Sequence, residues 1–125
     1  MMSLVPDGLK YTKDHEWAKI EGAVATVGVT DHAQRELGDI VFVELPKVGA
    51  TVQSGQSFGT IEAVKTVAEL YAPVSGTISE VNTALSADAG VINQDPYGNG
   101  WIIKVKVDKP SNEGLMEAAA YKALI

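Results

Sequence analysis

The sequence predicts a mainly β protein, an antiparallel barrel or sandwich, and three observations support this fold class. Short segments with strand character recur at near-regular spacing. Glycine and proline separate them, so that Glu21-Gly22 predicts an N-terminal hairpin turn and Pro46 ends a strand. Segments with helical character lie near residues 30–37 and 112–124. The predicted strands cover residues 15–21, 23–29, 40–45, 51–53, 57–62, 67–72, 77–81 and 101–107.

The first helix, near residues 30–37, is predicted from its two ends. Asp31, followed three residues later by Gln34, resembles a capping box, and Gly38 would end the helix. Residues 86–100 are predicted to form a long loop, because Asp, Pro, Gly and Asn are dense in its second half.

The second helix is predicted at the C-terminal end, over residues 112–124. Three consecutive alanines give this segment good helix propensity. Leu115, Ala119 and Lys122 fall on one stripe, which would pack on the β structure.

Length and composition bound the class of protein. With 125 residues, 46% of them hydrophobic and 21% charged, the chain fits one globular domain over residues 1–125. The net charge of −6 argues against a nucleic-acid partner, because phosphate backbones need a basic face. No apolar run approaches the roughly 18 residues of a membrane span, so no membrane partner is expected.

The chain contains no cysteine. Thiolate nucleophiles and cysteine metal sites are therefore excluded, and any thiol or redox chemistry must come from an added group. The first residues lack a charged region followed by an apolar stretch, so no signal peptide is expected. A cytosol-like compartment is expected, with an organellar protein that has lost its transit peptide as the alternative.

Lys65 is the most informative residue. Between Lys47 and Lys104 there is no other Lys, Arg or His, and predicted strands flank Lys65 on both sides. Gly49 and Gly76, on either side of this region, are interpreted as turn glycines with unusual dihedral angles. A lone amine at the tip of a hairpin is accessible from all sides. The pattern predicts a carrier whose cofactor arm is attached at Lys65.

Residues 48–82 resemble a biotinyl/lipoyl attachment domain, in which the modified lysine lies in a protruding hairpin. Biotin carriers typically have Ala-Met-Lys-Met at this turn, whereas this chain has Ala63-Val64-Lys65-Thr66 with Glu62 before it. That difference favours a lipoyl group over a biotinyl group at this turn. Almost the whole chain resembles the H-protein family of the glycine cleavage system. The four stretches that carry this second resemblance are residues 10–17, 27–34, 37–46 and 95–101.

The resemblance implies a lipoyl-domain-like barrel-sandwich hybrid with its attachment core at residues 24–107. It also implies lipoic acid bound covalently to Lys65, and recognition of Glu62 by a lipoate ligase or lipoyl transferase. In this family the loaded arm folds into a cleft. The correspondence assigns that cleft four further residues: Asp14, Glu16, His32 and Glu69.

The partners that the resemblance implies are the P, T and L proteins of the glycine cleavage system. The P protein, a glycine decarboxylase, would load an aminomethyl group onto the arm. The T protein, an aminomethyltransferase, would remove its methylene, and the L protein, dihydrolipoamide dehydrogenase, would reoxidise the arm. The chain itself would catalyse none of these steps. The expected compartment is the bacterial cytoplasm, or the mitochondrial matrix if a transit peptide has been removed.

Three alternatives stay open at this point. The chain could be a lipoyl domain of a 2-oxo acid dehydrogenase, or a lipoyl donor to other proteins. A different class is a small metal-dependent or acid–base enzyme that uses His15, Glu16 and His32. Phe42 and the two tryptophans are interpreted as core or cleft wall.

Overall fold

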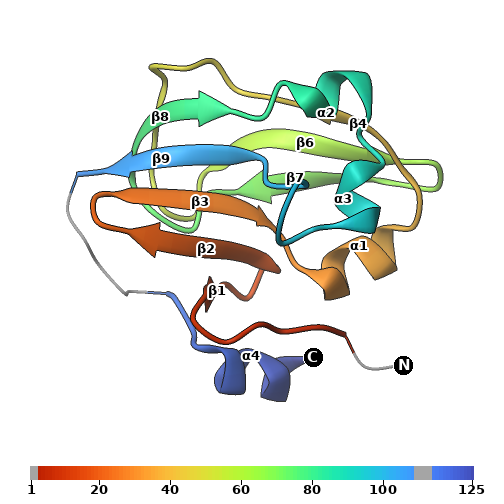
Figure 1. Ribbon diagram of the computed structural model, residues 1–125, viewed down its shortest axis with the longest axis horizontal. Helices are drawn as coiled ribbons and strands as arrows, with labels where there is room; N and C mark the ends of the chain where they lie inside the picture. The colour runs from red at the N-terminus through yellow and green to blue at the C-terminus, as the bar shows by residue number, and fades with distance from the viewer. Residues whose placement is uncertain (1–2, 109–113) are drawn as a thin grey trace.

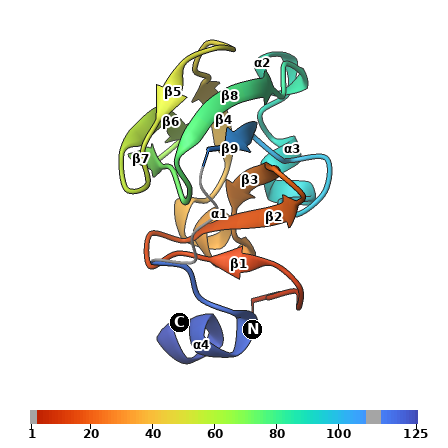
Figure 2. The ribbon, with the colours of Figure 1, turned by 90° about the vertical axis from the view of Figure 1, so that its left-hand side faces the viewer.

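The computed structural model describes residues 3–108 and 114–125. Within these ranges the strands form two antiparallel sheets (Figures 1 and 2). The first sheet has the order β1-β2-β3-β9-β8-β5 and the second has the order β4-β6-β7. The first sheet consists of β1 Lys10–Tyr11, β2 Glu16–Glu21, β3 Val24–Val29, β5 Thr51–Val52, β8 Gly76–Val81 and β9 Ile103–Val107. The second consists of β4 Ile40–Glu44, β6 Ser57–Ala63 and β7 Val67–Tyr71.

The predicted mainly β fold class is confirmed, in its sandwich form. In the described ranges β1 and β5 lie at the edges of one sheet, and β4 and β7 lie at the edges of the other. The strand pairs therefore leave two open sheets and no closed barrel. The helices are α1 Asp31–Leu37, α2 Ala84–Ala87, α3 Val91–Gln94 and α4 Ala118–Leu124.

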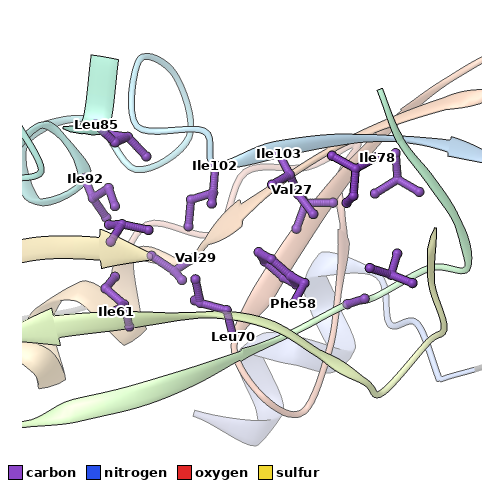
Figure 3. Packing of buried hydrophobic residues seen from close by; sticks show 14 of the residues in the cluster. Val27, Val29, Phe58, Ile61, Leu70, Ile78, Leu85, Ile92, Ile102 and Ile103 are labelled. Carbon is purple, nitrogen blue, oxygen red and sulfur yellow. The ribbon is translucent and has the colours of Figure 1, made fainter. Parts of the chain in front are cut away.

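One continuous hydrophobic core joins the two sheets (Figure 3). Val27 of the first sheet and Ile61 and Leu70 of the second are at most 1% exposed. Leu85 of α2 and Ile92 of α3 close one end of this core. Each such side chain contributes about 1.5–3 kcal/mol by leaving water. The core fixes the two sheets and the short helices as one body.

The segment predicted as an irregular loop at residues 86–100 contains α3, and α2 overlaps its start. Each of these helices has four residues. One helical turn is too short to give a hydrophobic repeat in the sequence. Burial of one apolar residue from each turn holds them in place.

The N-terminal cap of α1 is Thr30, one residue before the predicted cap at Asp31. Thr30 has extended dihedrals, and its hydroxyl oxygen accepts a hydrogen bond from the Ala33 N–H at 3.1 Å. Asp31 is the first helical residue, and Gln34 donates a side-chain hydrogen bond to it at 2.7 Å. Gly38 ends the helix with a φ of 77°, as its position predicts.

The C-terminal helix begins at Ala118, so the predicted span of 112–124 is wrong for residues 114–117; residues 112 and 113 lie outside the described part. Met116 instead forms a β-bridge with Tyr11, with N–O distances of 2.7 and 2.8 Å. The edge strand β1 offers unpaired backbone groups, and these hold the preceding chain extended.

The predicted packing face of this helix is also wrong. Ala119 and Lys122 are exposed, whereas Ala118 and Tyr121 are buried. They pack with Tyr11 and other side chains in a second cluster below β1, where Figure 2 shows α4. Ala118 and Tyr121 lie three residues apart on one face, and this is the face that meets Tyr11. No described helix is long and apolar enough to cross a membrane.

Candidate functional site

Lys65 lies in the turn that joins β6 to β7, at one end of the molecule (Figure 1). The Ala63 N–H donates to the Thr66 carbonyl at 2.8 Å, which leaves Val64 and Lys65 as the turn residues. The Val64 N–H donates to the Asp39 carbonyl at 2.9 Å and ties the tip to the start of β4. Lys65 is exposed and makes no salt bridge with any described residue.

Around this turn an outer patch of the three-stranded sheet, here called the hairpin face, exposes apolar side chains. Phe42 pairs with Glu62, which pairs with Val67, so these three lie in one row. A bulge in β4 interrupts the alternation and leaves Val41 and Phe42 both exposed. The interpretation of Phe42 as core or cleft wall is therefore wrong. The hairpin face consists of Val41, Phe42, Glu62, Val64 and Val67.

A cavity of about 150 Å³ lies between the two sheets and α1. We call it the acidic pocket, because four carboxylates line it together with apolar side chains. It brings together Asp14, Glu16 and Glu69, three of the four residues that the resemblance assigns to a cleft, whereas His32 is not in its lining. The lining consists of Asp14, His15, Glu16, Val29, Ala33, Glu36, Leu37, Ile61, Ala68, Glu69 and Leu70.

The side chain of Lys65 passes near the acidic pocket at the end of α1. A Cβ atom placed at Gly38 would lie 3.5 Å from Lys65 Cε, so the lysine stem passes beside this residue. The preceding residue, Leu37, lines the pocket. The lysine stem and the pocket therefore lie beside consecutive residues at the end of α1.

Glu16 has the most unusual environment in the pocket. It is 3% exposed, and its Oε1 atom has no hydrogen-bond partner in the described part of the chain. Burial, and then the nearby charge of Asp14, raise the pKa of Glu16 to about 9. Hydrogen bonds from the Thr12 side chain and the Tyr71 backbone lower this pKa, but by less than burial raises it. A buried carboxyl group with one unpaired oxygen atom favours a ligand that brings a donor or a positive charge.

Two histidines lie next to each other at this site. The rings of His15 and His32 are 4.8 Å apart. His15 Nδ1 is 2.8 Å from the Tyr121 hydroxyl, and His32 Nε2 is 2.7 Å from Glu36 Oε1. Burial, followed by the neighbouring His32, lowers the pKa of His15, which favours its neutral form.

The enzyme alternative gains no support from these histidines. Within the described ranges, no three His, Cys, Asp or Glu side chains form a group that could hold a metal. Each histidine already has one ring nitrogen bonded to another side chain.

The sequence interpretation missed two residues here, Glu36 and Tyr121. Glu36 lies four residues after His32 on α1, and that spacing could have indicated their pairing. Tyr121 lies 106 residues from its partner His15, and no local pattern connects them.

Together, a two-sheet sandwich and a hairpin that presents a single exposed lysine define an attachment domain of the lipoyl type. A family model described as glycine cleavage H-protein matches residues 9–125. The chain therefore belongs to the glycine cleavage H-protein family.

Curated relatives and a solved structure agree with this assignment. The glycine cleavage system H protein of Rubrobacter xylanophilus is 58% identical over 108 residues, covering 86% of each chain. That of Chlorobium limicola is 57% identical over 124 residues, covering 97% of each chain. The crystal structure of a glycine cleavage system H protein from Mycobacterium marinum has a TM-score of 0.88 and 45% identity. The match covers 95% of this chain and 97% of the Mycobacterium marinum chain.

Proposed function

We propose that Lys65 carries lipoic acid in amide linkage, and that the modified chain shuttles aminomethyl groups within the glycine cleavage system. The non-catalytic carrier role follows from membership of the family. The observation that carries the proposal is an exposed lysine in a two-residue turn. One backbone hydrogen bond closes this turn, and a second ties it to Asp39. Amide formation removes the lysine charge, and no described ion pair depends on that charge.

A tether suits this task for a physical reason. The lipoyl group would supply the sulfur chemistry that a chain without cysteine lacks. Held on a short flexible arm, its reactive end reaches an effective concentration near mM at a docked partner. The partners in this proposal are the P protein that loads the arm, the T protein that unloads it, and the L protein that reoxidises it. Bacterial relatives support the bacterial cytoplasm as the compartment.

The acidic pocket is the proposed resting place of the loaded arm. Glu16 and Asp14 supply negative charge for the amine, and the unpaired Oε1 of Glu16 can accept its hydrogen bond. Val29 and Ile61 supply apolar walls for the carbon chain. Glu69 is exposed and accepts a hydrogen bond from the Ser57 hydroxyl, which suits a position at the mouth. Enclosure would slow hydrolysis of the loaded arm by excluding water.

His32 takes an indirect part in this proposal. Because it does not line the pocket, we assign it to the wall behind His15, where it pairs with Glu36. The pair lies on one side of α1, four residues apart, and keeps the Glu36 carboxylate in place.

The hairpin face is the proposed recognition surface for the enzyme that attaches lipoic acid, a lipoate ligase or lipoyl transferase. Its four apolar side chains are between 48% and 75% exposed, which is typical of interaction sites when such residues cluster. Glu62 lies between Phe42 and Val67 in one row. An enzyme with an apolar surface for these side chains and a basic group opposite Glu62 would be complementary to the hairpin face.

Intact mass tests the attachment. We expect the chain, co-expressed with a lipoate ligase, to gain the mass of one lipoyl group. Lys65→Arg should abolish this gain, because guanidinium does not form the amide, whereas Lys47→Arg, a change at another exposed lysine, should keep it. Reconstituted glycine–bicarbonate exchange with the P protein should follow the same pattern. An adduct on Lys65→Arg would contradict the assignment.

A further inference from the structure

Tyr121 of α4 connects the C-terminal helix to the turn that carries the acidic side of the pocket. Its side chain is fully buried, and its ring stacks on that of Tyr11 with centroids 4.8 Å apart. Its hydroxyl lies 2.8 Å from His15 Nδ1 and 2.8 Å from Thr30 Oγ1. One hydroxyl therefore joins α4, the turn before β2 and the cap of α1.

The turn that Tyr121 contacts has an uncommon backbone. His15 has a φ of 69°, and it is the one residue other than glycine with a positive φ in the described ranges. The Thr12 carbonyl accepts from the His15 N–H at 3.1 Å, and the Thr12 hydroxyl accepts from the Glu16 N–H at 3.3 Å. A left-handed conformation is uncommon for a residue with a Cβ atom, so the surroundings must hold it. The next side chain along the chain is that of Glu16.

Tyr121 and Glu16 also interact electrostatically. Burial raises the pKa of Tyr121, the hydrogen bond with Thr30 opposes this, and the Glu16 carboxylate adds to the rise. Tyr121 does not itself line the pocket. Its hydroxyl reaches the pocket lining through two neighbours, His15 in the turn before Glu16 and Thr30 at the cap of α1. The route through His15 leads to the carboxyl whose oxygen has no partner in the described part of the chain.

We propose that Tyr121 is a positioning residue, whose hydroxyl holds His15 in its left-handed conformation and so aims the Glu16 carboxyl into the acidic pocket. This inference rests on the proposed function of the pocket. It gives the C-terminal helix a role in retaining the loaded arm, besides its packing on β1.

The test uses Tyr121→Phe in the full-length chain, with Tyr11→Phe as a matched control. Both changes remove one hydroxyl and keep the ring stack. The Tyr11 hydroxyl donates to the Pro6 carbonyl and is not bonded to His15. The first readout is the titration of Glu16, followed by the ¹³C signal of its carboxyl group in the unmodified protein. We expect its midpoint to fall toward the ordinary glutamate range in Tyr121→Phe and to stay unchanged in Tyr11→Phe.

The second readout is formaldehyde release from the aminomethyl-loaded chain. We expect release to be faster in Tyr121→Phe by up to about tenfold, as loss of one hydrogen bond allows, and unchanged in Tyr11→Phe. Adding Tyr121→Phe to Glu16→Gln should accelerate release no further, since both act through one carboxyl.

The outcomes distinguish the positioning role of Tyr121 from the proposed use of the acidic pocket. If Tyr121→Phe and Tyr11→Phe give the same Glu16 titration, the positioning role is overturned. If the titration moves only in Tyr121→Phe but Glu16→Gln releases formaldehyde at the wild-type rate, Tyr121 positions Glu16 as inferred, and the proposed use of the pocket fails instead.

Discussion

At the scale of single residues, Glu16 shows how burial changes a carboxyl group. The side chain is almost fully enclosed, and one of its oxygen atoms has no partner in the described part of the chain. Its pKa of about 9 means that the neutral acid predominates at pH 7 in the chain by itself. An arriving ammonium group would favour the carboxylate, so loading of the arm should release a proton.

The raised pKa of Glu16 also predicts a pH dependence of stability. The unfolded chain releases this proton near the ordinary value of 4.5, whereas the folded chain keeps it until about pH 9. The folded state therefore binds more protons in this window, and the stability present below pH 4.5 is lost as the pH rises toward 9.

Glu16→Gln removes the titrating proton but keeps the size of the side chain. We expect its free energy of unfolding, relative to wild type, to increase from pH 5 to pH 9. A gain of 1 kcal/mol would raise Tm by roughly 4 °C in a domain of this size. Thermal unfolding of both proteins at several pH values measures the difference, with Glu69→Gln at the exposed mouth as control. A constant difference would show that burial does not raise the pKa of Glu16.

At the scale of the elements, the pairing of strands explains two glycines that look alike in the sequence. Gly49 has a φ of 95°, and a Cβ atom there would meet nothing within 4 Å. Gly76 lies at the start of β8 without a positive φ, and a Cβ atom there would lie 2.0 Å from the Lys106 carbonyl oxygen. Gly49 is a turn glycine as predicted. The same interpretation is wrong for Gly76, which allows a close approach of two strands.

The positive φ at Gly49 and the close approach of strands at Gly76 predict different losses of stability when alanine replaces each glycine. Gly49→Ala should lower the free energy of unfolding by about 1 kcal/mol, the cost of a left-handed residue with a Cβ atom. Gly76→Ala should cost about 3 kcal/mol, because the β8–β9 pair must shift to relieve the clash. Urea unfolding with a common m-value gives both figures. Equal costs would contradict the close-approach explanation.

At the scale of the whole molecule, the lysine turn and the C-terminal helix lie in separate places. The exposed hairpin lies at one end of the sandwich, and α4 lies below β1 (Figures 1 and 2). The net charge is −6, and the proposed acylation of Lys65 would remove one positive charge and change it to −7. An enzyme that docks as proposed would meet an acidic protein whose lysine turn is flanked by exposed apolar side chains.

The hairpin face predicts how attachment should respond to surface changes. Phe42→Ser and Glu62→Gln should each raise the KM for lipoate attachment, lowering kcat/KM by roughly tenfold, while the folded structure persists. Ile20→Ser is the matched control, because Ile20 is a 41% exposed apolar residue on β2, in the other sheet. Initial rates of attachment, followed by mass, provide the measurement. If the Phe42 and Glu62 variants match the Ile20 control, recognition lies elsewhere.

Local sequence patterns were sufficient to predict much of this architecture. Alternating apolar residues and glycine or proline breaks predicted most of the strands, because a strand buried on one face repeats every two residues. The hairpin around Lys65 was predictable for the same reason. Three of the four expected pocket residues line one cavity, and those assignments came from the resemblance to a family.

What the chain determined alone was therefore local: the β class, the lysine turn and the absence of cysteine chemistry. Tertiary structure decided the rest. Pairing of Met116 with β1 moved the start of the last helix, and burial of one residue in each turn formed α2 and α3. The contact between Tyr121 and His15 spans 106 residues. Hydrogen bonds and burial at such separations depend on where the sheets place the chain, and no local repeat encodes that.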